Sequence, residues 1–225
     1  MIGSFGNGTA LRMALWPAMI LAAVSSAPAL AECRQLAPLL QRQPTAEEWR
    51  QVESMGVVSW LTEVEGSPVK EGVAVGLVEA PPERVFEVVT DNARFADFMP
   101  YVKVSVVETL ADGSLVNLQQ LDLPWPIKDR EYKITLFNKA GDTVAAPMWQ
   151  SSWTHVKGFG NIEESRGAWR AFTCGDASLV EYQVYTDPGG SIPTYFKNTA
   201  TRRSLRRLIE AVRDRARDPI YDPSD

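Results

Sequence analysis

The chain has 225 residues, of which 45% are hydrophobic and 23% charged, and its formal net charge is −5. These proportions are typical of one globular domain and exclude a disordered or fibrous protein. The acidic balance argues against nucleic-acid binding, because contacts to phosphates need a basic surface.

The first 31 residues predict a signal peptide. Arg12 precedes an apolar run over residues 13–24, and Ala29 and Ala31 are the small residues that a signal peptidase needs. Because the run is short and contains Pro17, we expect cleavage after Ala31 rather than a membrane-spanning helix. The protein is then exported, to the periplasm or to the outside of the cell. An uncleaved membrane anchor is the alternative.

The chain contains two cysteines, Cys33 and Cys174. An exported protein is able to join them in a disulfide, which would tie the mature N-terminus to a late strand. Two free thiols are the alternative, since the sequence does not show which residues lie close together in space.

Residues 32–56 predict a polar lead-in and one short helix. The sequence TAEE is typical of a capped helix start, in which Thr45 or its neighbour is the cap and Glu48 follows three residues later. We expect this helix to end near Met55, before Gly56.

Alternation of polar and apolar residues predicts strands through most of the remaining chain. The expected strands cover residues 57–65, 69–79, 102–110, 115–123, 131–138, 144–155, 162–172 and 179–186. We expect the first two to form a hairpin. The last six, most of which are separated by short turns, are expected to form an antiparallel meander.

Two further helices complete the pattern. The sequence PPE at residues 81–83 places proline and an acid in a first helical turn, which is typical of a helix start. Residues 192–217 form the longest helical stretch, with apolar residues at helical spacing. The rest of its surface carries many basic residues, namely Lys197, Arg202, Arg203, Arg206, Arg207, Arg213, Arg215 and Arg217. We interpret this charge as a solvated helix face; docking on an anionic membrane is the alternative.

The residues that enzymes commonly use are sparse. The chain has a single histidine, His155, so a histidine-based metal site would lack partners, and no nucleophile, phosphate-loop or dinucleotide motif occurs. We therefore expect no metal and no cofactor. His155 shares one face of its strand with Trp149 and Trp153, and we interpret it as a neighbour of core aromatics; proton transfer is the alternative.

The segment LPWPIKDREY, which ends at Tyr132, carries four consecutive charges at the start of a strand. Alternation places Arg130, Tyr132 and Ile134 on the more apolar face of that strand. Arg130 would then be a cation in apolar surroundings, and it would need a carboxylate or a ligand oxygen as its partner. The first alternative is an ion pair that organises the sheet, and the second is a direct ligand contact.

Several of these strings together resemble the START domains, the lipid-binding branch of the helix-grip superfamily. LPWPIKDREY is similar to the family's Pro-aromatic-Pro segment and the Asp-Arg-Asp-type sequence after it, although Glu131 stands where many members have Asp. DPGGSIPTYFKN at residues 187–198 is similar to the start of the family's terminal helix. PPERVF at residues 81–86 and FMPY at residues 98–101 resemble the first helix and connector of the wider superfamily. Most familiar members work inside cells, whereas this chain is expected to be exported.

The resemblance implies an α+β helix-grip fold over residues 57–217, with residues 218–225 as a tail. About eight or nine strands would form a curved antiparallel sheet wrapped around the C-terminal helix. An apolar cavity beneath that helix would hold one lipid-like molecule, and transfer between membranes would be the activity. A cyclase or dehydratase acting on a polyketide or another cyclic hydrophobic substrate is the alternative, and a lipid sensor or partner-binding module is the third.

The expected ligand contacts combine the strand alternation with the resemblance. The candidate cavity residues are Arg130, Tyr132, Ile134, Trp149, Trp153, His155, Trp169, Phe196 and Leu205. Large apolar side chains of this kind suit a flat or extended hydrophobic ligand. A monomer that makes transient contact with a membrane surface is the expected state.

Overall fold

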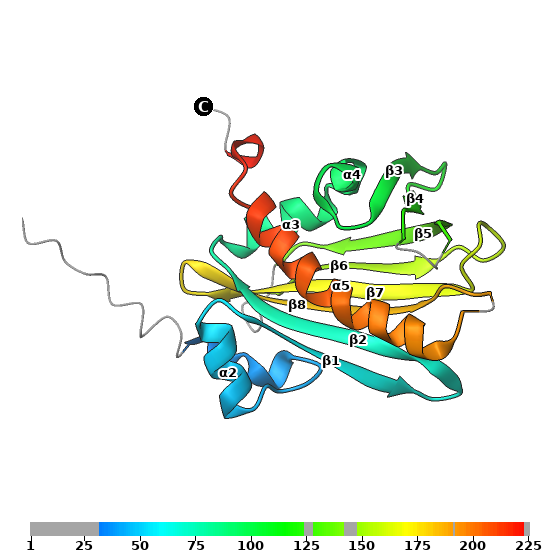
Figure 1. Ribbon diagram of the computed structural model, residues 1–225. Helices are drawn as coiled ribbons and strands as arrows, with labels where there is room; N and C mark the ends of the chain where they lie inside the picture. The colour runs from blue at the N-terminus through cyan, green and yellow to red at the C-terminus, as the bar shows by residue number, and fades with distance from the viewer. Residues whose placement is uncertain (1–31, 124–127, 142–147, 191, 223–225) are drawn as a thin grey trace, which may run out of the picture.

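The fold is built on one antiparallel sheet of eight strands within the described part of the chain (Figure 1). The computed structural model describes residues 32–123, 128–141, 148–190 and 192–222. The strands lie in the order β1-β2-β8-β7-β6-β5-β4-β3. Their bounds are β1 (Val57–Val64), β2 (Ser67–Val78), β3 (Val102–Thr109), β4 (Leu115–Leu121), β5 (Arg130–Lys139), β6 (Met148–His155), β7 (Glu164–Cys174) and β8 (Ala177–Asp187). The expected α+β architecture with a curved antiparallel sheet and a long C-terminal helix is confirmed.

The helices pack around this sheet, and Figure 1 shows the long α5 crossing it while the short α2 lies beside β1 and β2. Their bounds are η1 (Ala37–Leu39), α2 (Ala46–Glu53), α3 (Pro82–Thr90), η2 (Asn92–Arg94), α4 (Phe95–Phe98), α5 (Thr194–Arg215) and η3 (Pro219–Tyr221). Among the described residues, no helix has the length and apolar character needed to cross a bilayer.

Strand β2 is buried on both of its faces, because successive side chains point to opposite sides of the sheet. Ala74 packs in one core with Leu205 of α5. Its neighbours Val73 and Val75 pack in a second core with Val52 of α2. The half of the sheet that contains β2 is therefore covered by α5 on one side and by the N-terminal segment on the other.

The N-terminal segment is fixed by a cap and a disulfide. The Thr45 hydroxyl accepts a hydrogen bond from the Glu48 amide, and the Glu48 carboxylate accepts one from the Thr45 amide, which is the expected capping box. Cys33 and Cys174 are joined, with their Cα atoms 5.1 Å apart. Of the two alternatives for the cysteines, the structure has the bonded one, and it ties the segment to the end of β7.

Two glycines of β2 let α5 approach the sheet closely. A Cβ atom at Gly72 would lie 2.8 Å from the Thr201 methyl group and 3.1 Å from the Leu205 side chain. A Cβ atom at Gly76 would lie 3.0 Å from Ile209. Both glycines lie in the interior of a strand, where the missing side chain admits the helix.

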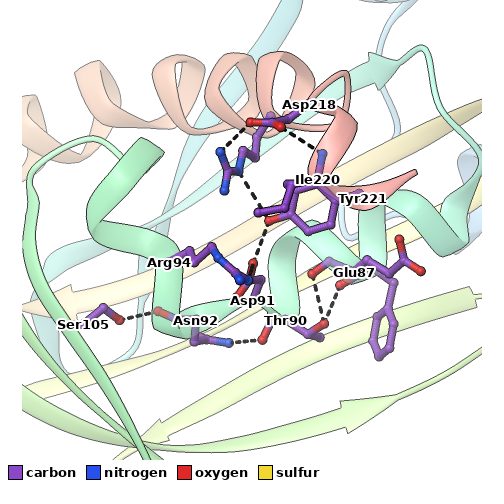
Figure 2. Close-up of polar contacts among 11 residues, drawn as sticks. Glu87, Thr90, Asp91, Asn92, Arg94, Ser105, Asp218, Ile220 and Tyr221 are labelled. Carbon is purple, nitrogen blue, oxygen red and sulfur yellow. Dashed lines mark hydrogen bonds and ion pairs between the residues drawn. The ribbon is translucent and has the colours of Figure 1, made fainter. Parts of the chain in front are cut away.

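The residues after α5 pack back on the molecule rather than forming a loose tail. Figure 2 shows Tyr221 pointing at Asp91, just beyond the C-terminal end of α3, and the two side chains are joined by a 2.8 Å hydrogen bond. Asp218 caps η3 by accepting from the Ile220 amide at 3.0 Å, and it pairs with Arg215 at 2.7 Å. These contacts fix the C-terminal end of α5 against α3.

A few expected boundaries differ from the structure or lie outside its described residues. Strand β7 begins at Glu164 rather than at residue 162, because the preceding turn is held against β5 by a bond from the Asn161 amide to the Glu131 carbonyl, 2.9 Å. The expected start of β6 at residue 144 and the PWPI part of LPWPIKDREY lie outside the described residues.

Candidate functional site

A cavity of about 490 Å³ lies between the sheet and α5, which is within the range of small-molecule sites. Its wall is mostly apolar and comes from β4 to β8, from α5 and from the segment that joins α3 to β3. The apolar lining residues are Val89, Phe95, Met99, Pro100, Val102, Leu121, Leu123, Ile134, Leu136, Trp153, Trp169, Val184, Pro188 and Leu208. Such a space accommodates one hydrophobic molecule.

Strand alternation positions the floor of the cavity. Tyr132, Ile134 and Leu136 of β5 are buried and line it, and so do the alternating residues Ser151 and Trp153 of β6. Four of the candidate residues from the sequence thus lie in the lining, namely Tyr132, Ile134, Trp153 and Trp169.

The deep polar groups of the cavity are neutral and hydrogen-bonded within the protein. The Tyr132 hydroxyl donates to the Gln119 carboxamide oxygen at 2.6 Å. The Trp153 indole N–H donates to the Ser165 hydroxyl at 3.2 Å, and Ser165 in turn bonds Thr186 at 3.2 Å. Because these pairs satisfy one another, the cavity can hold apolar groups without leaving the paired atoms uncompensated.

Aromatic rings form one wall. The Tyr182 ring lies 4.2 Å from the Trp169 ring and 5.9 Å from the Trp153 ring, between ring centroids. Burial raises the pKa of Tyr132 and of Tyr182, and the neighbouring Tyr132 raises the pKa of Tyr182 further. Both phenols therefore stay neutral at physiological pH and offer flat surfaces and hydroxyl groups rather than charge.

The charged lining residues all come from α5 and are basic: Lys197, Arg203 and Arg207. Lys197 pairs with Asp187 at 2.6 Å, and Arg207 donates to the Tyr101 hydroxyl at 2.9 Å. Among the described lining residues there is no aspartate, glutamate, histidine or cysteine. The described residues also contain no cluster of such side chains that could hold a metal ion.

Asp187 carries an altered pKa at this edge of the cavity. Partial burial acts to raise the pKa of its carboxyl, but the Lys197 ammonium group and the Gly189 amide outweigh that effect, so the pKa is lowered. The carboxylate is therefore ionised at neutral pH and holds the N-terminal end of α5 to β8.

Arg130 lies outside the lining, and the expectation that it faces a ligand or a carboxylate is wrong for the described residues. Its guanidinium donates to the Pro188 carbonyl at 2.8 Å and to the Lys128 carbonyl at 3.0 Å. Arg130 is the first residue of β5 and is buried, so the loop that precedes α5 folds over it. Backbone oxygens thus take the place of the expected partner.

Trp149 and His155 also lie outside the lining, although they share a strand face with Trp153. The Trp149 ring lies 5.1 Å from the Phe86 ring, between centroids, so α3 covers that end of β6. At the opposite end, the His155 Nδ1 atom lies 3.2 Å from the Glu163 carbonyl oxygen. The cavity spans the middle of this strand and not its ends.

The two candidates on α5 have different outcomes. Leu205 is fully buried and faces β2, where it belongs to the core that α5 forms with the sheet. The side chain of Phe196 lies outside the described residues. The lining residues of α5 that the sequence analysis did not single out as ligand contacts include Arg203, Ser204 and Arg207. Their spacing of three and four residues places them on one helix face, which had been interpreted as solvated.

Gln119 and Tyr182 were also missed in the sheet. Gln119 lies in the polar stretch NLQQL of β4, which reads as solvent-facing, and Tyr182 lies in β8 beside the lining residue Val184. The alternation of Tyr182 with Val184 is a signal that could have located this part of the wall.

Comparison with known proteins places this architecture among hydrophobic-ligand binders. A family model described as "polyketide cyclase / dehydrase and lipid transport" matches residues 78–213. An uncharacterized protein of Pseudomonas aeruginosa is 26% identical over 180 residues, which cover 76% of this chain and 88% of the relative.

Solved structures share the fold. A STAR-related lipid transfer protein from Xanthomonas axonopodis has a TM-score of 0.64 at 24% identity, over 72% of this chain and 94% of that one. Human StAR-related lipid transfer protein 5 has a TM-score of 0.60 at 14% identity, over 84% and 96%. The ZhuI aromatase/cyclase from Streptomyces has a TM-score of 0.52 at 16% identity, over 68% and 96%. These likenesses establish a START-like helix-grip fold.

Proposed function

Because the chain belongs to the family of polyketide cyclases, dehydrases and lipid-transport proteins, we propose that it binds one lipid or similar hydrophobic molecule and carries it between membranes. The observation that carries this proposal is the apolar cavity of about 490 Å³, whose deep polar groups are neutral and paired. Such a site supplies apolar volume and offers no nucleophile or carboxylate among its described lining residues.

The energetics favour a carrier with an apolar interior. A lipid chain exposed to water costs about 0.8 kcal/mol per CH₂, or on the order of 13 kcal/mol for about sixteen carbons. A cavity that accepts the chain removes most of this cost without any covalent step. The aromatic wall formed by Trp153, Trp169 and Tyr182 provides the required apolar surface.

A transfer assay tests the proposal. Val184 lines the cavity, so Val184→Trp is expected to fill it and to reduce transfer of a fluorescent fatty acid between vesicles at least about tenfold. The matched control is Val106→Trp, which adds the same side chain at an exposed position of β3 and should leave transfer within about twofold. Circular dichroism should show both variants folded. Equal transfer by wild type and a folded Val184→Trp variant would reject the cavity as the carrier site.

An enzyme of the cyclase or dehydratase type is the second candidate, and the shared fold of the ZhuI aromatase/cyclase supports it. Such an enzyme would release a product that differs covalently from the bound molecule. Incubation of the purified protein with its extracted ligand, followed by mass spectrometry, separates the two functions. An unchanged mass favours the carrier, and a new mass that requires folded protein favours the enzyme.

We further propose that the carrier works outside the cytoplasm. The signal peptide expected over residues 1–31 supports export, and the bond between Cys33 and Cys174 suits an oxidising compartment. Fractionation of cells that express the full chain with a C-terminal tag is expected to recover it, shortened at Ala31, outside the cytoplasmic fraction. Recovery of the full-length chain in the cytoplasm would reject this assignment.

A further inference from the structure

The charge of the cavity lining is opposite in sign to that of the whole chain. The chain has a formal net charge of −5, yet the charged side chains in the described lining are Lys197, Arg203 and Arg207. All three come from the N-terminal and middle turns of α5. The cavity therefore has a cationic rim on one side and a neutral interior on the other.

Two of these cations lack a carboxylate partner. Lys197 is paired with Asp187, and the nearby Arg206, which does not line the cavity, is paired with Glu210 at 2.7 Å. None of the ion pairs among the described residues involves Arg203 or Arg207. The two guanidinium groups are four residues apart on the helix, a spacing at which like charges destabilise it. An anion placed near both would relieve that repulsion.

Tyr101 holds one of the two groups at the rim. The Tyr101 hydroxyl accepts from Arg207 at 2.9 Å, and the Tyr101 carbonyl accepts from the Asp122 amide at 2.9 Å. The backbone of Tyr101 has a φ of 68°, which is unfavourable for a residue other than glycine. A single neutral hydroxyl uses one of the five guanidinium donors, so the other donors of Arg207 can serve a ligand.

We propose that the natural ligand is an amphiphile with an anionic head group, a carboxylate or a phosphate, bound by Arg203 and Arg207 with its apolar part in the cavity. This assignment rests on the proposed function. Guanidinium groups match the geometry of carboxylate and phosphate oxygens and stay charged at physiological pH. The head group belongs at the rim because the deep polar groups, such as Tyr132 and Gln119, are neutral and already bonded to one another.

Three amphiphiles with the same chain test the head-group preference. Hexadecanoate, hexadecyl phosphate and hexadecanol should each displace the neutral dye Nile red from the protein at pH 7.5. We expect the two anions to bind at least about tenfold more tightly than the alcohol, which is the gain of one charge-assisted contact. Equal affinities for all three would overturn the head-group assignment while leaving the apolar carrier in place.

Charge-removing variants locate the effect. The double variant Arg203→Gln and Arg207→Gln should reduce the preference for the anions to less than about twofold and leave hexadecanol affinity unchanged, because the apolar part of the site is intact. The matched control is Arg202→Gln, which removes the same charge from an exposed position of α5 outside the lining and should keep the full preference. A preference that survives in the double variant would reject Arg203 and Arg207 as the head-group site.

Further arms separate other sources of the effect. A wild-type protein that binds neither Nile red nor any of the three amphiphiles would reject the proposed function itself, a result that differs from equal binding of all three. Displacement of hexadecyl phosphate by millimolar inorganic phosphate would indicate a simple anion site and overturn the amphiphile. If the double variant keeps its anion preference but loses sedimentation with phosphatidylglycerol vesicles, the two arginines dock on membranes and the proposal is wrong.

Discussion

Two charged side chains fix the turn that leads into α5. From the sheet, Arg130 donates to the Pro188 carbonyl at 2.8 Å. From the turn itself, Asp187 accepts from the Lys197 ammonium at 2.6 Å and from the Gly189 amide at 3.0 Å. The turn therefore depends on both charges, and neither side chain lines the cavity.

Replacement of Arg130 by glutamine should lower stability and leave ligand binding intact. Loss of the charge-assisted bonds leaves the Pro188 carbonyl without this donor, and we expect the free energy of unfolding to fall by about 1.5–3 kcal/mol. Urea denaturation measures this change, and Nile red binding below the transition should stay within about twofold of wild type. A tenfold loss of binding with unchanged stability would instead mean that Arg130 contacts the ligand.

Asp187→Asn should destabilise the protein in a pH-dependent way. Because the pKa of Asp187 is lowered in the folded state, its ionised form stabilises the fold above the unfolded pKa of about 3.9, and this stabilisation disappears as the pH falls through the lower folded pKa. We expect the variant to lose about 1.5–3 kcal/mol at pH 7 and the difference from wild type to vanish near about pH 2. An equal loss at both pH values in urea denaturation would show that the carboxylate charge is not responsible.

The sheet is covered on its two faces by elements that are held in different ways. Helix α5 sits close to β2 because Gly72 and Gly76 leave room for Thr201, Leu205 and Ile209. The segment with α2 instead reaches its place through the Cys33–Cys174 bond and the core around Trp49 and Val52. The first contact positions the roof of the cavity, and the second stabilises the opposite face without touching the cavity.

Removal of the disulfide should therefore cost stability and spare the site. Cys33 and Cys174 are 141 residues apart, and closing so long a loop stabilises by about 5 kcal/mol in the chain-entropy account. The double variant Cys33→Ser and Cys174→Ser should show a correspondingly lower midpoint in urea, together with Nile red affinity close to wild type under native conditions. An unchanged midpoint would mean that the bond does not constrain the unfolded chain.

The strands and helices could be predicted because their signals are local. Alternation located all eight described strands, and the TAEE cap at Thr45 located α2. The site could be predicted only in part. Alternation tells which strand face points inward, as for Tyr132 and Trp153, but not where a helix covers that face, so Trp149 and His155 were placed in the cavity wrongly. The carbonyl partners of Arg130 depend on the fold of a loop that follows far later in the chain.

The molecule as a whole is filled on one side and hollow on the other. Over β1, β2 and β8 the helix α5 packs its fully buried Leu205, Ile209 and Val212. Toward β4, β5 and β6 its polar and basic face meets the cavity instead. The packed half gives the fold its stability, and the open half gives it a place for a ligand, which is the division expected of a carrier.

The most direct test of this account is to purify the mature protein, extract it with organic solvent and weigh what is released by mass spectrometry. The account predicts about one unmodified amphiphile per chain from wild type and from Val106→Trp, and very little from Val184→Trp. A wild-type protein that releases nothing, and that cannot be loaded with hexadecanoate or hexadecanol, would contradict it.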